Sequence, residues 1–377
     1  METADRRLTL VSSSLEAGGA ERVASTLANR WSDRGISVHI ITYSKESAEP
    51  FYELDPRIAL TQLNIAHPSL NVVSAAISNV KRIIRLRRTI LSSQPDVVIS
   101  FLTETNVLTL MAMFGTRIPV IVTEHTDPEI CRMSSVWSKL RGFTYRFANN
   151  VVVLNRHIQD YFWDRMRIRT TIIPNPIVQS EARRNVRQQH TKQIVSVGRF
   201  AAEKRFELLV RAFYRVSKRC PDWNLIIIGD GPQRPDIREL AEELGISDRV
   251  LLPGPTKDPE AVLRQSKIFV STSVQEGFPM ALCEAMANGL AVVSAEYNAS
   301  VRNIIEDGVN GLLVPVDDEE AVAVAINRLI DTPEERERLG TAARNITDEY
   351  GVNRVMAIWE SVFEKTSAKV APQVTND

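Results

Sequence analysis

Short apolar runs rich in Val and Ile alternate along the chain with longer segments of helical period, and this alternation constrains the fold more than any other feature. The runs are continuously apolar, which is typical of parallel strands covered by helices on both faces. We expect strands in the first half at 8–12, 38–42, 97–100, 120–123 and 151–154. In the second half we expect them at 193–197, 224–228, 250–252, 268–271, 291–294 and 311–314. The sequence therefore predicts an α/β protein with two doubly wound parallel sheets.

A proline-punctuated segment at residues 172–177 separates the halves, and the polar stretch after it has the composition of an interdomain linker. With 377 residues the chain is long enough for two domains of ordinary size. We expect an N-terminal domain over 1–178, a linker over 179–192 and a C-terminal domain over 193–350. Residues 367–377 are expected to form a disordered tail.

Composition excludes several classes of protein. A chain with 44% hydrophobic and 24% charged residues is neither disordered nor collagen-like. Its cysteines, Cys131, Cys220 and Cys283, match no disulfide framework and no zinc pattern, which favours a reducing compartment. The first apolar run is too short for a signal peptide, and no run reaches the ~18 residues of a spanning helix. We therefore expect a cytoplasmic chain, soluble or peripherally bound to a membrane.

The 46 basic and 46 acidic side chains balance, which argues against a nucleic-acid partner. Residues 1–180 carry 21 Lys and Arg against 16 Asp and Glu, whereas residues 181–377 carry 25 against 30. A basic half fits a protein that rests one end on an anionic membrane surface. A chance distribution explains the same counts equally well.

A Gly and Pro turn follows the strand expected at 268–271 and leads into a short helix. Such a turn presents backbone N–H groups and the positive end of the helix dipole to a phosphate. Glu276 and Glu284 flank the turn, and a carboxylate can accept hydrogen bonds from paired sugar hydroxyls. Alternatively, Glu276 caps the helix and Glu284 lies on a solvated face. The candidate phosphate-binding residues between them are Gly277, Phe278, Pro279, Met280 and Ala281.

Glycines and cations follow the first two strands of the second half. Arg199 and Lys204 come after Gly198, where they could neutralise a diphosphate. Cations at a helix start oppose the helix dipole, so without an anion the placement is mildly unfavourable. The alternative is a pair of ordinary surface cations. Gly229 follows the next strand and is by itself only a turn signal, but its position makes it a candidate ligand-binding residue.

The first half offers a weaker set of candidates. Gly18 and Gly19 let the backbone approach a ligand before a helix expected over 21–34, although the full G-x-G-x-x-G pattern is missing. His125 lies just past the strand expected at 120–123, and its role can be structural or functional.

A helix expected over 77–91 carries a basic stripe and no acidic residue, which is unusual for a face that is merely solvated. It could contact anionic lipid headgroups or a diphosphate carried on a lipid. The alternative is a helix that packs on the protein through its apolar face and exposes its other faces to solvent. The cations proposed for this contact are Lys81, Arg82, Arg85 and Arg88.

These motifs together resemble a known family. The span from Glu276 to Glu284 resembles the E-x7-E motif of the family-four retaining glycosyltransferases, which have the two-domain GT-B fold. Gly198, Arg199 and Lys204 resemble their G-R-x(4)-K segment, and residues 18–22 resemble their G-G-A-E-R loop. With 98–102 and the basic helix, the chain is most similar to bacterial enzymes that extend undecaprenyl-diphosphate-linked oligosaccharides. Arg205 departs from the pattern, because many relatives have glycine there.

The resemblance implies two Rossmann-like domains facing each other across a cleft, the first binding the acceptor and the second a nucleotide sugar, with UDP-sugar favoured. It implies that Glu284 binds the ribose and Glu276 the donor sugar, while Arg199 and Lys204 stabilise the leaving diphosphate. His125 would contact the sugar from the first domain. A final helix over 351–366 would cross back to the first domain. The acceptor would be a lipid-linked glycan, with no cofactor and no metal required.

Other functions remain open at this point. The chain could be a GT-B-like nucleotide-sugar epimerase or a glycan phosphorylase, or a protein that binds sugar nucleotides or lipid-linked glycans without catalysis. The intact glutamate pair and the cations argue against the last. The sequence identifies neither the sugar nor the acceptor.

Overall fold

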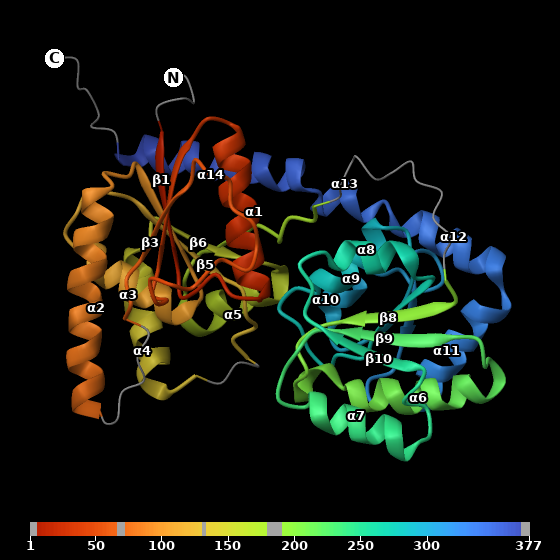
Figure 1. Ribbon diagram of the computed structural model, residues 1–377. Helices are drawn as coiled ribbons and strands as arrows, with labels where there is room; N and C mark the ends of the chain where they lie inside the picture. The colour runs from red at the N-terminus through yellow and green to blue at the C-terminus, as the bar shows by residue number, and fades with distance from the viewer. Residues whose placement is uncertain (1–5, 66–71, 130–132, 179–190, 371–377) are drawn as a thin grey trace. The chain divides into compact units, whose positions relative to one another are not determined.

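The computed structural model describes residues 6–65, 72–129, 133–178 and 191–370 (Figure 1). It divides into two compact units. The N-terminal unit comprises Met1–Pro176 and Val355–Asp377, and the C-terminal unit comprises Ile177–Arg354. Most of the expected linker, 179–190, and the end of the expected tail, 371–377, lie outside the described residues.

The N-terminal unit is built on a parallel sheet with the strand order β3-β2-β1-β4-β5-β6-β7. Each strand pairs in parallel with its neighbour, as the continuously apolar runs predict. The strands are β1 (Arg7–Ser12), β2 (Ser37–Thr42), β3 (Ala59–Gln62), β4 (Val97–Phe101), β5 (Val120–Glu124), β6 (Asn150–Val153) and β7 (Thr171–Ile172). The helices are α1 (Gly19–Asp33), α2 (Val72–Ser92), α3 (Thr103–Met113), α4 (Ser135–Thr144), the 3-10 turn η2 (Tyr145–Phe147), α5 (Arg156–Met166) and, from Val355 on, α14 (Val352–Val370).

The C-terminal unit has a second parallel sheet, with the order β10-β9-β8-β11-β12-β13. In Figure 1, α6 and α7 cover one face of its strands, and α8, α9 and α10 lie on the other. The strands are β8 (Gln193–Val197), β9 (Asn224–Ile228), β10 (Val250–Gly254), β11 (Ile268–Ser271), β12 (Ala291–Ala295) and β13 (Leu312–Val314). The helices are η4 (Ala202–Lys204), α6 (Phe206–Arg219), α7 (Arg234–Glu243), α8 (Pro259–Gln265), α9 (Met280–Ala287), α10 (Ala299–Arg302), α11 (Glu319–Asp331), α12 (Pro333–Ala343) and α13 (Ile346–Tyr350). The predicted α/β fold with two doubly wound sheets is confirmed.

The C-terminal helix packs on the N-terminal unit through aromatic side chains. Trp31 of α1 is fully buried, and its ring meets Trp359 edge to face at 5.8 Å and Phe363 at 5.1 Å. Aromatic pairs of this geometry add to the free energy gained by burying their area. Helix α14 continues to Val370, whereas the sequence predicts an end at residue 366, so residues 367–370 are helical and do not belong to the expected disordered tail.

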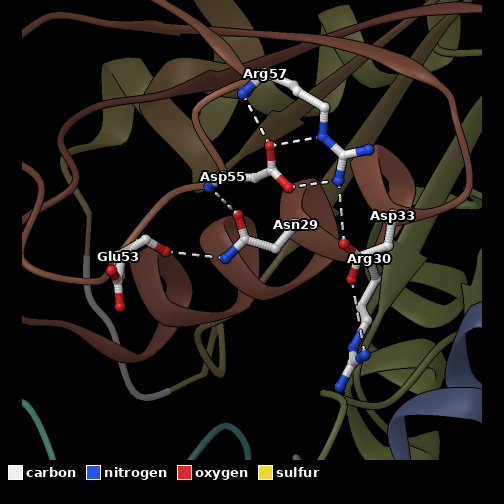
Figure 2. Close-up of polar contacts among 6 residues, drawn as sticks. All are labelled: Asn29, Arg30, Asp33, Glu53, Asp55 and Arg57. Atoms are coloured by element: carbon white, nitrogen blue, oxygen red, sulfur yellow. Dashed lines mark hydrogen bonds and ion pairs between the residues drawn. The ribbon is translucent and has the colours of Figure 1, made fainter.

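Two strands, β3 and β7, were not predicted from the sequence. Polar contacts attach the loop before β3 to α1 (Figure 2): the Asn29 amide donates to the Glu53 carbonyl at 2.9 Å and accepts from the Asp55 backbone N–H. Arg57 donates to the Asp55 carboxylate at 2.8 Å, and these hydrogen bonds lower the pKa of Asp55 to about 2. The position of β3 is therefore fixed by contacts distant in sequence, and its four residues carry little apolar signal of their own.

Candidate active site

The strand order of the C-terminal sheet reverses between β8 and β11, which are hydrogen-bonded neighbours. In doubly wound sheets, ligands bind at the carboxyl edge at this switch point, because the two following loops diverge to opposite faces. The loop after β8 carries Gly198, Arg199 and Lys204, and the loop after β11 carries Glu276. The topology therefore brings the two motifs found in the sequence to the expected ligand edge.

Lys204 and Glu276 form an ion pair at this edge. The Lys204 ammonium lies 2.6 Å from a Glu276 carboxylate oxygen, and each side chain is only 17% exposed. The same oxygen accepts a hydrogen bond from the Ser273 hydroxyl at 2.8 Å. Glu276 therefore does not cap the helix: Pro279 is at the N-cap position, with no side-chain hydrogen bond to the helix.

Backbone contacts hold the two loops together. The Thr272 hydroxyl donates to the carbonyl of Lys204 at 2.8 Å, and the Val274 N–H donates to the carbonyl of Glu203 at 2.9 Å. A lysine ammonium has three donors, and its bond to Glu276 uses one of them. The remaining donors give this half-buried cation the capacity to bind phosphate oxygens at the strand edge.

Glu284 lies on α9 and is buried, so the alternative of a solvated position is wrong. Burial raises the pKa of the neighbouring Cys283 thiol well above its usual value, and the charges of Glu284 and Glu276 raise it further. Both carboxylates thus act on one thiol. The structure brings the glutamate pair to the same region of the C-terminal unit.

The turn between the glutamates offers fewer amides than the sequence suggests. Pro279 has no N–H, and the Met280 N–H donates to the Phe278 carbonyl at 2.9 Å. The Phe278 ring is buried against Tyr350 at 5.5 Å, so its side chain anchors the turn by packing. Ala281 lies in the first turn of α9, where a helix dipole favours an anion, and Gly277 lies in the loop before the helix.

Arg199 differs from Lys204 in its surroundings. Its side chain is 71% exposed and pairs with Glu203 at 3.0 Å. An exposed pair of this kind contributes little to stability, and salt screens it. The hydrogen bond to Glu203 uses one of the five N–H donors of Arg199, so the side chain keeps donors for a ligand but is more solvated than Lys204.

Gly198 and Gly229 lie back to back where β8 and β9 end. A Cβ atom on Gly229 would stand 1.9 Å from the Gly198 carbonyl oxygen, and its φ of +140° is rare for other residues. A Cβ atom on Gly198 would stand 3.0 Å from Cε of Lys204. Gly229 is thus required by the packing of the strand ends, and Gly198 leaves room for the lysine.

Arg205, which departs from the family pattern, is in the left-handed conformation with φ 51° and ψ 42°. This conformation costs a residue with a Cβ about 1–2 kcal/mol, which explains why glycine suits the position. We expect Arg205→Gly to raise the free energy of unfolding by about 1 kcal/mol. Loss of the ion pair between Arg205 and Asp317, at 3.0 Å, should offset a small part of this gain. Arg205→Ala, which loses the pair but keeps the strain, is the control. Equal stability of the two variants in urea unfolding would contradict the explanation.

The N-terminal unit contains the remaining candidates. Helix α1 begins at Gly19, and a Cβ atom added to Gly19 would meet nothing within 4 Å. His125 follows β5, its ring stacks on Phe101 at 5.4 Å, and its Nε2 lies 3.0 Å from the Thr123 hydroxyl. Gly18, Gly19 and His125 thus belong to a different unit from the Lys204–Glu276 pair.

His125 is neutral at neutral pH. Burial lowers its pKa to about 4, and the nearby Asn175 side chain opposes this shift in part. Because the unfolded imidazole titrates near 6.5, the unfolded chain binds the proton first as the pH falls. His125 should therefore make the free energy of unfolding decrease between about pH 6.5 and pH 4, by up to ~1.4 kcal/mol per pH unit. Urea unfolding of His125→Gln across this range should show a shallower slope; an unchanged slope would contradict the assignment.

The basic helix α2 has exposed cations and cations that are engaged in packing. Lys81, Arg85 and Arg88 are exposed. Arg82 is half-buried and donates to the Ile65 carbonyl at 3.0 Å, and Arg87 donates to the Ala112 carbonyl at 2.6 Å. Arg82 is therefore engaged in a hydrogen bond within the N-terminal unit. The other three cations proposed for the membrane contact are exposed.

Sequence reasoning missed Ser273, Thr272 and Tyr297. Ser273 and Thr272 follow a strand and belong to no motif, so only the contacts in the folded protein reveal them.

Burial raises the pKa of Tyr297 well above its usual value, and the charge of Glu276 raises it further. The buried Tyr297 hydroxyl has no hydrogen-bond partner among the residues that the structure describes. Within the same residues, no cluster of three His, Cys, Asp or Glu side chains could hold a metal ion.

Comparison with solved structures supports the fold. The chain resembles sucrose-phosphate synthase from Thermosynechococcus elongatus with a TM-score of 0.80, at 19% identity and covering 97% of this chain and 100% of that one. It also resembles Anabaena Alr3699/HepE in complex with UDP, with a TM-score of 0.73, at 18% identity and covering 95% and 100%. Two doubly wound units, together with this likeness, define the GT-B fold.

The sequence comparisons identify the family. The model of glycosyl transferases group 1 matches residues 178–346, and that of Glycosyltransferase Family 4 matches residues 17–181. A Campylobacter jejuni relative, named GalNAc-alpha-(1->4)-GalNAc-alpha-(1->3)-diNAcBac-PP-undecaprenol alpha-1,4-N-acetyl-D-galactosaminyltransferase, is 26% identical over 355 residues, 94% of this chain and 97% of its own. The protein belongs to the GT-B glycosyltransferases that combine these two domains, so the resemblance drawn from its motifs is confirmed.

Proposed function

We propose that the protein transfers a hexose or N-acetylhexosamine from a nucleotide diphosphate sugar, preferably a UDP-sugar, to a lipid-linked oligosaccharide in cell-surface polysaccharide or glycan biosynthesis. Support for the acceptor comes from the Campylobacter relative, whose name specifies an undecaprenol-diphosphate glycan. Support for the donor comes from the Anabaena neighbour, which was solved with UDP. Transfer with retention of anomeric configuration follows the family-four resemblance. The nucleotide sugar is a co-substrate, and the proposal includes no separate cofactor and no metal.

The observation that carries the proposal is the half-buried Lys204–Glu276 pair at the switch point of the C-terminal sheet. Departure of a nucleoside diphosphate concentrates negative charge on its phosphate oxygens. A fixed ammonium and a helix N-terminus stabilise that charge more in the transition state than in the ground state. The site thus has the electrostatics that breaking a sugar–diphosphate bond requires.

In this proposal each candidate residue has a separate task. Lys204 binds the diphosphate through the ammonium N–H groups that do not bond to Glu276. Arg199 adds a second, solvent-exposed cation. The Glu276 carboxylate has further lone pairs for the donor-sugar hydroxyls, and buried Glu284 accepts from the ribose. His125 contributes a neutral imidazole from the N-terminal unit. The acceptor hydroxyl then attacks the sugar carbon as the diphosphate leaves, and a phosphate oxygen takes its proton.

The exposed cations of α2 are proposed to meet the anionic surface at the cytoplasmic face of the membrane. Lys81, Arg85 and Arg88 face solvent, and α2 contains no acidic residue. Over the part of the chain that the structure describes, no helix has the length and apolar character needed to cross a bilayer. Peripheral, charge-driven attachment would bring the enzyme to a lipid-linked acceptor.

The proposal is tested first by binding. A ligand that binds only the folded state raises the melting temperature, so UDP, ADP, GDP and common UDP-sugars should be compared in a thermal-shift assay. We expect UDP and at least one UDP-sugar to raise the melting temperature, and Lys204→Met to reduce the shift. A chain that responds to no nucleotide would contradict the proposed donor class.

The second test is product analysis. Incubation of the donor with an undecaprenyl-diphosphate oligosaccharide in detergent should give an extended lipid-linked glycan and free UDP, with the anomeric configuration read by NMR. An epimerised sugar nucleotide formed without any acceptor would instead support an epimerase, and the inverted anomer would exclude retention.

A further inference from the structure

An exposed aromatic patch lies on the N-terminal unit, outside the candidate active site. It consists of Met111 and Phe114 at the end of α3, Phe143 in the last turn of α4, and Phe147 in η2. The Phe114, Phe143 and Phe147 side chains are 65%, 64% and 49% exposed. Phe147 packs edge to face against the other two rings, each at 5.4 Å. Contiguous exposed apolar groups of this kind mark interaction surfaces.

The aromatic patch surrounds a shallow apolar hollow. The hollow has a volume of about 360 Å³, and Leu110 and Thr144 complete its lining. The Thr144 hydroxyl donates to the Leu140 carbonyl at 2.8 Å, so its hydrogen-bonding capacity is directed into its own helix. The hollow therefore offers nothing that would select a polar ligand, and an apolar chain fits it best.

The charges around the aromatic patch have a single sign. Arg87 of α2 donates to the Phe114 carbonyl at 3.0 Å, which ties the basic helix to the end of α3. The described helices α2, α4 and η2 contain no acidic residue, and the acidic residue of α3, Glu104, lies in its first turn, at the end away from Phe114. The exposed cations that these elements and the adjoining loop contribute are Lys81, Arg85, Arg88, Arg117, Lys139 and Arg146. This rim complements an anionic surface and would repel a second copy of itself.

Helix α2 extends the apolar surface between its cations. Val80, Ile84 and Leu91 are exposed on it, beside Arg85 and Arg88. Figure 1 shows α2, α3 and α4 as neighbours, and contacts join α2 to α3 and α3 to α4. Basic side chains around exposed aromatic and aliphatic groups are the pattern of helices that lie in a membrane interface.

We propose that the aromatic patch inserts into the acyl region of an anionic phospholipid bilayer while the cations around it bind the headgroups. This inference rests on the proposed membrane-borne acceptor and extends it from charge-driven contact to insertion. Phe and Leu are typical of the apolar face that interfacial helices bury at the boundary between headgroups and acyl chains. The patch then contributes attachment that salt does not screen, whereas the cations contribute attachment that it does.

The test is vesicle flotation of the full chain with vesicles of phosphatidylcholine and about one third phosphatidylglycerol, at about 0.1 M and about 1 M salt. We expect the parent protein to stay partly bound at high salt. Phe143→Ser combined with Phe147→Ser should lower partitioning about tenfold or more at high salt and less at low salt. Arg85→Glu combined with Arg88→Glu should show the opposite pattern. Val324→Ser, which removes an exposed apolar side chain in the C-terminal unit, is the matched control and should bind as the parent does.

Transfer to a short water-soluble acceptor analogue in detergent should be unchanged in the Phe143→Ser, Phe147→Ser variant, so failure of the membrane inference is distinct from failure of the proposed function. In vesicles with brominated acyl chains, the tryptophan fluorescence of a Phe143→Trp variant should be quenched more strongly than that of the parent protein. Unchanged flotation of the double serine variant at both salt concentrations would overturn the proposal. The proposal would also be overturned if the double serine variant lost only its binding of the isoprenoid acceptor in detergent. It would likewise be overturned if the variant lost only self-association of the chain.

Discussion

Lys204→Met is expected to lower kcat by about 10²–10³-fold, the loss typical when one preorganised charge stabiliser is removed. Methionine keeps the length and apolar stem of lysine but removes the ammonium that lies 2.6 Å from Glu276. The charge that develops on the departing diphosphate then loses a fixed cation in a half-buried place where water screens little. The effect should fall mainly on kcat, because the charge is larger in the transition state than in the bound donor.

Two controls separate this role from a general loss of structure. Lys192→Met removes an exposed lysine of the same unit, which pairs with Asp222, and should leave kcat unchanged. Arg199→Met should cost less than Lys204→Met, because the Arg199 side chain is 71% exposed. Steady-state kinetics with melting temperatures alongside would check all three. An active, folded Lys204→Met variant would remove Lys204 from the mechanism.

Much of the fold follows from the sequence because burial on both faces leaves a local signal. The bounds of β8, β9 and β11 agree with the continuous apolar runs residue for residue. Strand β3 carries no such run, and contacts from Asn29 and Arg57 position the loop before it. The sequence therefore predicts every strand of the C-terminal sheet and the inner strands of the N-terminal sheet, but it misses β3 and β7, the two short edge strands of the N-terminal sheet.

The candidate site was predictable as a set of residues but not as a set of contacts. Parallel strands place their following loops at one edge, so the sequence could locate Lys204 and Glu276 there. It could not show that the two are paired, nor that Ser273 shares the carboxylate, because these contacts depend on side-chain positions. The burial of Glu284 and the exposure of Arg199 were likewise settled only by packing.

Glu276→Gln is expected to lower kcat/KM for the donor by about 10–100-fold, since hydrogen bonds to a charged group are worth about 1.5–3 kcal/mol. Glutamine keeps the shape of the side chain and still accepts from Ser273, but it loses the charge that binds Lys204 and strengthens acceptance from sugar hydroxyls. The amide fills the same space, so the fold should be kept, but the loss of the charge that pairs with Lys204 should lower the free energy of unfolding. A kcat/KM equal to that of the parent protein would contradict the role of Glu276.

Comparison with Ser273→Ala and Glu284→Gln determines what the Glu276 carboxylate does. Ser273→Ala keeps the charge and removes one donor, so a loss of only a few-fold would show that the charge matters more than its orientation. Glu284→Gln should weaken binding of free UDP and raise the donor KM with little change in kcat, because a ribose contact is equally strong in the ground and transition states. Glu276→Gln should not weaken UDP inhibition, since UDP lacks the sugar and loss of the Glu276 charge leaves Lys204 more attractive to the diphosphate. If both glutamine variants weakened UDP equally, the two carboxylates would share one role, and the division between ribose and sugar would be wrong.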